Sequence, residues 1–173
     1  MSFAVWITGP PAAGKSTLAA AVRRALAARG LRVAVLESDA ARRRLTPRPR
    51  YDEKEREAFY AALVWIGKLL VDHGVPVLFD ATAHRRRWRT RARRRIRRFL
   101  EVYVRCPLDV RRARDPKGLY RKAREGRAPA LPGAGVPYEP PEAPDLVVRG
   151  DRDDPGEAAR RIVRELAARG YLK

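Results

Sequence analysis

The chain has a single cysteine and no apolar run long enough for a membrane. One cysteine among 173 residues excludes an internal disulfide, as is typical of a cytoplasmic protein. The longest apolar runs, at residues 61–66 and 75–79, are far shorter than the roughly 20 residues that cross a bilayer. No charged segment followed by a long apolar stretch opens the chain, so we expect neither a membrane partner nor a signal peptide.

Acidic residues are also scarce relative to basic ones. The sequence holds 39 Lys and Arg against 20 Asp and Glu, a formal net charge of +19. Such a positive field attracts nucleotides, sulfated or phosphorylated metabolites and nucleic acid. Most of the basic residues are arginines spread along the whole chain, so a compositional bias explains the charge equally well. We therefore use the charge only to favour an anionic substrate.

The hydrophobic pattern predicts strands that alternate with helices. Apolar and helical periodicities predict strands at residues 3–8, 33–36, 75–79, 102–104 and 146–148, and helices at 15–28, 52–72, 86–98 and 155–169. This alternation implies an α/β fold in which about five parallel strands lie between two layers of helices, a three-layer sandwich. The length suits one domain over residues 1–173.

One long segment breaks the alternation. Residues 111–144 are rich in Pro, Gly and charge, and contain no predicted strand. A segment of this length inside a compact domain is usually functional, and we expect it to form a lid over an active site.

A phosphate-binding motif follows the first predicted strand. Residues 9–17 read Gly-Pro-Pro-Ala-Ala-Gly-Lys-Ser-Thr, which fits the Walker A pattern between a strand and a helix. The loop's backbone amides and the helix N-terminus would bind the phosphates of ATP, Lys15 would reach the β- and γ-phosphates, and Ser16 would ligate Mg²⁺. The nucleotide-binding residues expected here are Gly9, Ala12, Ala13, Gly14, Lys15, Ser16 and Thr17.

The motif predicts a nucleoside triphosphate without saying what is done with it. The chain is too short for most ATPase motors, and it lacks the Asn-Lys-x-Asp motif with which GTPases read guanine. Among proteins with a phosphate loop, a small P-loop kinase is therefore the class that fits best.

Two acids follow the next strands of the predicted sheet. Asp39 follows the second strand, at the sheet edge where ligands of such folds bind. There its carboxylate could accept the proton of an attacking hydroxyl or hold a magnesium-bound water. The alternative role is to cap the next helix. Asp80 closes the third strand in a Walker B pattern and is the second expected metal ligand. We expect Lys15 and Asp39 to be the catalytic residues.

Several arginines follow the same strand ends. Guanidinium groups match the geometry of phosphate and sulfate, so these arginines are candidates for holding an anionic acceptor, although a solvated surface role fits any single one better. They are Arg42, Arg56, Arg86 and Arg89. His84 lies close by but has no evident partner in the sequence.

The second half of the chain closely resembles the adenylylsulfate kinases. The resemblance lies in residues 99–110, in the Asp-Pro-Lys-Gly-Leu-Tyr string at 115–120, and in residues 137–144. It implies a P-loop kinase that uses ATP and Mg²⁺ to phosphorylate the 3′-hydroxyl of adenylylsulfate, giving 3′-phosphoadenylylsulfate for sulfate assimilation. It further implies a mobile lid in which Lys117, Gly118 and Leu119 approach adenylylsulfate and Arg114 lies near ATP. A homodimer is left open.

The middle of the chain departs from that family. Of the family's Asp-Gly-Asp-Asn-x-x-Arg, Asp39 and Arg42 match, while the Asn is lost. Of Asp-Arg-x-x-Asn, Arg56 matches and the Asn becomes Phe59. Of Ser-Pro-Tyr-Arg only Arg86 matches. This region is more similar to the polynucleotide-kinase and zeta-toxin branch of P-loop kinases, in which an Asp-Ala-Thr stretch follows the third strand.

Three hypotheses follow from these observations. The first is an adenylylsulfate kinase in which Arg42, Arg56 and Arg86 hold the acceptor's anionic group. The second is a kinase for a polynucleotide 5′-hydroxyl or another small hydroxyl metabolite, with nucleic acid bound along the basic helix at 85–98. The third is an ATP-binding regulatory protein that transfers nothing.

Overall fold

The computed structural model describes residues 2–172 and contains one sheet of five parallel strands, as the sequence predicts. The strands are β1 (Ala4–Thr8), β2 (Ala34–Glu37), β3 (Val77–Asp80), β4 (Phe99–Arg105) and β5 (Leu146–Arg149). Their spatial order is β2-β3-β1-β4-β5, and every pair of neighbours is parallel. Among residues 2–172, no helix is both long and apolar enough to cross a membrane.

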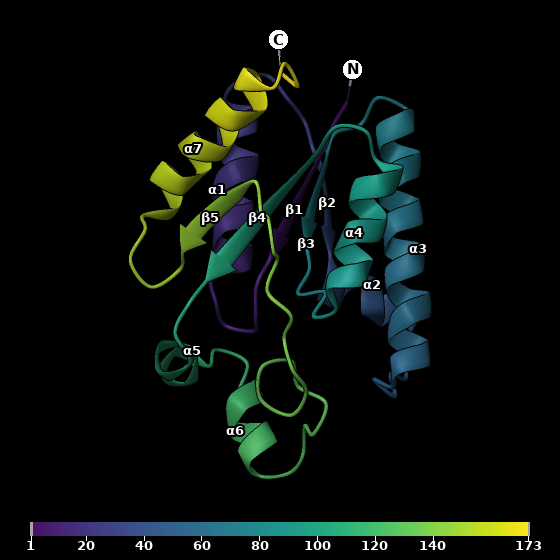
Figure 1. Cartoon of the computed structure of the whole chain (residues 1–173), viewed down its shortest axis with the longest axis vertical. Coiled ribbons are helices and arrows are strands. Elements are labelled where there is room, and N and C mark those ends of the chain that lie inside the picture. The colour runs from purple at the N-terminus through teal and green to yellow at the C-terminus, as the bar shows by residue number, and fades with distance from the viewer. Residues whose placement is uncertain (1, 173) are drawn as a thin grey trace.

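Helices cover both faces of this sheet (Figure 1). Helices α1 (Lys15–Ala27) and α7 (Pro155–Ala168) lie on one face, and α3 (Glu53–Asp72) and α4 (Arg86–Arg95) lie on the other. Successive side chains of β1 point to opposite faces, so Val5 and Ile7 enter the core beneath α1 and α7, whereas Trp6 stacks on Phe79 in the core beneath α3 and α4. Burial on both faces explains why β1 reads as a continuous apolar run.

The strand order places a crevice at the carboxyl edge of the sheet. β1 lies between β3 and β4, and the helices that follow β1 and β3 pack on opposite faces. Ligands of open α/β sheets bind at such a switch point, beyond the carboxyl ends of the strands. Three short helices lie near this edge: α2 (Ser38–Leu45), α5 (Leu108–Arg114) and α6 (Leu119–Arg124), the last two extending well beyond it in Figure 1.

The structure corrects the helix expected at residues 86–98. α4 ends at Arg95, Ile96 has an extended backbone (φ −112°, ψ 108°), and β4 already begins at Phe99. Phe99 packs into the same core as Trp88, but from a strand. The four-residue spacing of apolar residues therefore continued past the end of the helix by coincidence.

Three helices were not predicted. No residue of α2 is buried, so the sequence carries no apolar stripe there. α5 and α6 have seven and six residues; α6 lies within the expected lid and α5 overlaps its start, so the lid contains helices although it contains no strand.

Candidate active site

The phosphate loop joins β1 to α1 and depends on two glycines. A Cβ on Gly9 would lie 2.5 Å from the carbonyl oxygen of Val104 on the neighbouring strand, so no larger residue fits there. Gly14 adopts φ 103° and caps the N-terminus of α1, in a region of backbone conformation that favours glycine. The loop is therefore shaped at both ends by the absence of a side chain, as phosphate binding by backbone amides requires.

Lys15 begins α1 and curls back over the loop. Its Nζ donates to the carbonyl oxygen of Pro10 over 3.0 Å. Burial lowers the pKa of Lys15 to about 8, although the carboxylates of Asp80 and Asp39 oppose this shift. The ammonium thus lies in a site that lacks a sufficient counter-charge, and an incoming phosphate would supply one.

A magnesium ion would find oxygen ligands beside this lysine. Ser16 is exposed in the first turn of α1. Asp80 ends β3, and its carboxylate lies close enough to Lys15 to oppose the lowering of that lysine's pKa. A hydroxyl and a carboxylate fit Mg²⁺, which binds proteins through one or two such groups and completes its shell with water and substrate phosphates. Within residues 2–172, no three His, Cys, Asp or Glu side chains form a group that could hold a metal ion.

Asp39 and Lys117 connect the sheet edge to the lid. Asp39 lies in the first turn of α2, and its carboxylate accepts a hydrogen bond from the Lys117 ammonium, 78 residues further along the chain. That hydrogen bond is the main cause of the raised pKa of Lys117. Both side chains are about half exposed. The pair lies near Lys15, whose pKa responds to both charges, so the expected catalytic and lid residues meet at one place.

The lid is anchored to the phosphate loop by two residues that sequence reasoning missed. Arg111 is buried and donates to the carbonyl oxygen of Cys106 (3.0 Å) and to the hydroxyl of Tyr120 (2.5 Å). The Tyr120 hydroxyl in turn donates to the carbonyl oxygen of Pro11 over 3.0 Å. Nothing in a run of arginines marks Arg111 as buried, so the sequence offered no signal for it.

The remaining lid candidates lie beside these anchors. Gly118 caps α6 with φ 62°, and Leu119 is the first residue of that helix. Arg114 is exposed and donates to the carbonyl oxygen of Gly150 over 2.7 Å. Arg114 and Gly118 line a hollow of about 520 Å³, together with the rest of residues 112–118 and Arg121.

Arg42 and Arg56 meet around an aromatic ring. Their guanidinium carbons lie 5.2 Å and 5.6 Å from the ring centroid of Tyr51, and Arg42 lies 3.9 Å from that of Phe59. Glu55 pairs with Arg42 over 3.4 Å. Tyr51 is 44% exposed and has φ 59°, which is unusual for a residue with a side chain and is often found at functional sites. Sequence reasoning missed Tyr51, since only the structure shows its contact with the two arginines.

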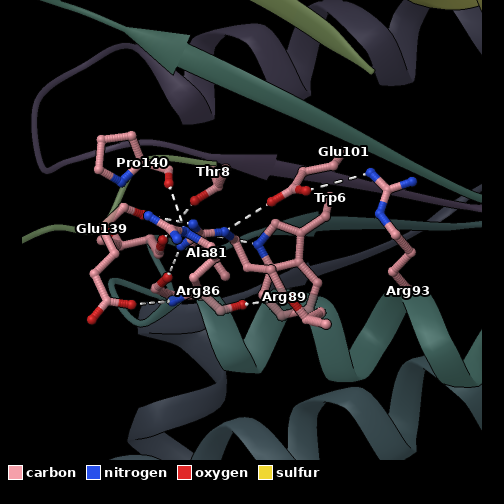
Figure 2. Close-up of polar contacts among 12 residues, drawn as sticks. Trp6, Thr8, Ala81, Arg86, Arg89, Arg93, Glu101, Glu139 and Pro140 are labelled. Atoms are coloured by element: carbon pink, nitrogen blue, oxygen red, sulfur yellow. Dashed lines mark hydrogen bonds and ion pairs between the residues drawn. The ribbon is translucent and has the colours of Figure 1, made fainter. Parts of the chain in front are cut away.

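The structure separates the other two candidate arginines from this group. Arg86 pairs with Glu142 and donates to the carbonyl oxygen of Pro140 over 3.1 Å (Figure 2). Its role in holding the acceptor stays a prediction. Arg89 is only 1% exposed and binds Glu101 of β4 over 2.9 Å. Its other donors contact the backbone of Ala83 and Glu139, so Arg89 is a structural residue and cannot hold an acceptor.

Comparisons with known proteins agree with one another. A family model described as adenylylsulphate kinase matches residues 1–149. A probable adenylyl-sulfate kinase of Archaeoglobus fulgidus is 44% identical over 154 residues, which is 89% of this chain and 99% of that protein. A probable adenylyl-sulfate kinase of Pyrococcus abyssi is 39% identical over 170 residues, 98% of each chain.

A solved structure shows the same arrangement over nearly all of the chain. The APS kinase CysC of Mycobacterium tuberculosis, in complex with AMPPNP and APS, superposes with a TM-score of 0.89 at 34% sequence identity. The match covers 96% of this chain and 98% of that one. The α/β fold with a parallel sheet flanked by helices is thereby confirmed.

Proposed function

The chain belongs to the adenylylsulfate kinase family, and we propose that its phosphate loop, Asp39 and the arginines around Tyr51 carry out that family's reaction. The reaction transfers the γ-phosphoryl group of ATP to the 3′-hydroxyl of adenylylsulfate and gives 3′-phosphoadenylylsulfate. The observation that carries the assignment of residues is the meeting of Lys15, Asp39 and Lys117 at the carboxyl edge of the sheet, beneath a lid bonded to the phosphate loop.

On the donor side, the chain binds and neutralises the triphosphate. Backbone amides of the loop and the N-terminus of α1 face the β- and γ-phosphates, and Lys15 exchanges the carbonyl oxygen of Pro10 for phosphate oxygens. Ser16 and, through water, Asp80 would hold Mg²⁺. When bound, that ion offsets the negative charge of the phosphates.

On the acceptor side, Asp39 accepts the proton of the attacking hydroxyl. As the 3′-oxygen forms its bond to the γ-phosphorus, the bond between that phosphorus and the bridging oxygen of ADP breaks, and the hydroxyl proton passes to the Asp39 carboxylate. Asp39 is held by Lys117 in this structure. On substrate entry we expect Lys117 to exchange Asp39 for an anion of the acceptor, which leaves both Asp39 oxygens available to the hydroxyl.

The ring of Tyr51 and its two arginines suit an anionic nucleotide. Arg42 and Arg56 supply guanidinium donors for the phosphosulfate group, and the exposed Tyr51 ring offers a flat face on which a base stacks. Phe59 stands where the family has an Asn. Its ring holds Arg42 by a cation–π contact at 3.9 Å, beside the ion pair of Arg42 with Glu55.

The second hypothesis, a polynucleotide acceptor, loses much of its support. The basic face of α4 is partly neutralised, because Arg87 and Arg91 pair with Glu57 of α3, and Arg86 pairs with Glu142. The arginines of this helix therefore serve its packing as well as its charge. Family membership also favours transfer over an ATP-binding role without transfer.

A side-by-side acceptor assay tests the proposal. Labelled ATP and Mg²⁺ are incubated with adenylylsulfate or with a 5′-hydroxyl oligonucleotide, using the wild type and Lys15→Ala as the inactive control. We expect kcat/KM for adenylylsulfate to exceed that for the oligonucleotide by at least a hundredfold. Transfer to the oligonucleotide alone contradicts the proposal, and ATP binding without transfer to either supports the third hypothesis. The cytoplasmic location and the homodimer stay predictions, which fractionation and light scattering test.

A further inference from the structure

His84 is buried beside the acceptor arginines, and the reaction described above does not use it. Its side chain is 2% exposed. The preceding residue, Ala83, has φ 41°, a left-handed conformation rare for a residue with a side chain. The Ala83 amide donates to the hydroxyl of Tyr60 over 3.0 Å, and the His84 ring packs edge-on against Trp88 at 4.9 Å. A strained turn after β3 thus fixes the direction of this ring.

The ring faces Arg56. Nη1 of Arg56 donates to Nδ1 of His84 over 3.0 Å. Since a guanidinium can only donate, Nδ1 must be the unprotonated nitrogen and the ring proton lies on Nε2. Burial and the charges of Arg56, Arg85 and Arg89, opposed only by Glu139, lower the pKa of His84 to about 4. The imidazole is therefore a neutral acceptor at physiological pH.

Arg56 is held at three points that belong to three segments. Besides the bond to His84, Nε donates to the carbonyl oxygen of Tyr51 (2.9 Å), and Nη2 donates to that of Ala130 in the lid (2.6 Å). These three bonds use one N–H on each guanidinium nitrogen. One N–H therefore stays free on Nη1 and one on Nη2. The side chain is 5% exposed, so the contacts, not solvent, decide where those donors point.

We propose that His84 is a positioning residue, which holds the Arg56 guanidinium so that its two remaining N–H groups face the anionic group of the acceptor. This inference rests on the proposed function. Without a hydrogen-bond acceptor at Nδ1 of His84, the Arg56 guanidinium would keep its charge but lose one of the three contacts that fix its orientation. Binding of adenylylsulfate would then weaken, while binding of ATP at the phosphate loop would not.

Three variants separate positioning from packing. His84→Leu removes the hydrogen-bond acceptor. His84→Asn removes the ring but places its amide oxygen at the same distance along the side chain as Nδ1. His73→Leu is the matched control, because this second histidine is exposed at the end of α3, away from the site. Steady-state KM for adenylylsulfate, KM for ATP and kcat are measured for each at pH 7.5.

We expect His84→Leu to raise KM for adenylylsulfate about tenfold, as the loss of one hydrogen bond to a charged donor predicts, with KM for ATP and kcat within about threefold of wild type. His84→Asn should restore KM to within about threefold, and His73→Leu should match wild type. Unchanged KM in His84→Leu, equal losses in Asn and Leu, or a joint rise in both KM values would overturn the inference.

Two further outcomes are informative. If His84→Leu does not fold, Arg56→Lys supplies the comparison. A lysine cannot hold three separated contacts, and we expect the same rise in KM for adenylylsulfate alone; no rise overturns the inference. If the wild type does not phosphorylate adenylylsulfate, both the proposed function and this inference are wrong. If the wild type is active and the variants keep its KM for adenylylsulfate, only this inference is wrong.

Discussion

The hydroxyl of Tyr120 donates to the carbonyl oxygen of Pro11 over 3.0 Å, and so bonds helix α6 of the lid directly to the phosphate loop. Arg111 completes the arrangement by donating to the same hydroxyl. The segment that we expect to close over the nucleotide is thereby in contact with the phosphate loop. A change at this phenol should alter both ATP binding and the exclusion of water.

Tyr120→Phe removes the hydroxyl and keeps the ring. We expect KM for ATP to rise about three- to tenfold, and ATP hydrolysis without acceptor to increase, because a loosely held lid admits water. Both are measured by release of ADP with and without adenylylsulfate. Tyr171→Phe, near the end of the chain and far from the lid, is the control. Wild-type values in Tyr120→Phe would show that the hydrogen bond does not govern closure.

Lys15→Ala should abolish phosphoryl transfer, since no other ammonium begins the helix at the loop.

The pH dependence of ATP binding tests the electrostatics of Lys15 separately. The pKa of Lys15 is about 8 in the free protein, and bound phosphate raises it. ATP binding therefore takes up protons near pH 8, and affinity falls as pH rises from about 8 to 10. Calorimetry in buffers of different ionisation enthalpy measures the uptake; Lys15→Arg should remove it.

Asp39→Asn should lower kcat by about 10²- to 10⁴-fold while changing the Kd for ATP by less than about threefold, because the amide cannot accept the acceptor's proton. Single-turnover transfer and equilibrium ATP binding give the two quantities. Near-normal turnover in this variant would remove Asp39 from the mechanism.

Neutral His84 should make stability depend on pH. The imidazole has a pKa of about 4 in the folded protein and about 6.5 when unfolded, so only the unfolded chain binds this proton between those values. The contribution is fully present above pH 6.5 and is lost as pH falls towards 4, by at most about 3 kcal/mol. Urea titrations across this pH range give the free energy of unfolding of the wild type and of His84→Asn. The difference between the two measures the contribution of His84. A constant difference would contradict it.

Arg89 supports the fold rather than the reaction. Arg89→Met leaves Glu101 buried without its main partner, and we expect a loss of about 3–5 kcal/mol in the free energy of unfolding. The double variant Arg89→Met with Glu101→Leu should recover most of that loss, because no lone charge then stays buried. Urea unfolding measures both. Equal stability of the single variant and wild type would mean that solvent reaches Glu101.

Much of the fold was predictable because the sheet is buried on both sides. Runs such as β1 are continuously apolar, and the Gly-rich break before Lys15 fixes where a strand becomes a helix. α2 was not predictable, since none of its residues is buried and its sequence has no apolar face. Its position directly after β2 depends on packing that periodicity does not report.

The site was predictable where chemistry follows strand ends and not where it crosses the lid. Lys15, Asp39 and Asp80 could be chosen because each follows or ends a strand of the parallel sheet, and the structure brings their charges together; their roles stay predictions. Arg111 was missed and Arg89 was taken as an acceptor-binding candidate because buried and exposed arginines look alike in a chain this rich in them. Burial of an arginine depends on partners distant in sequence, such as Glu101 for Arg89 and Tyr120 for Arg111.

The position of the transferred phosphoryl group tests the account most directly. Wild-type protein is incubated with ATP, Mg²⁺ and adenylylsulfate, and phosphorus NMR of the purified product locates the new phosphate. We predict a phosphomonoester on the 3′-oxygen of adenylylsulfate, formed by wild type and absent with Lys15→Ala. A phosphate at another position, or adenylylsulfate recovered unchanged while ATP is bound, would contradict the account.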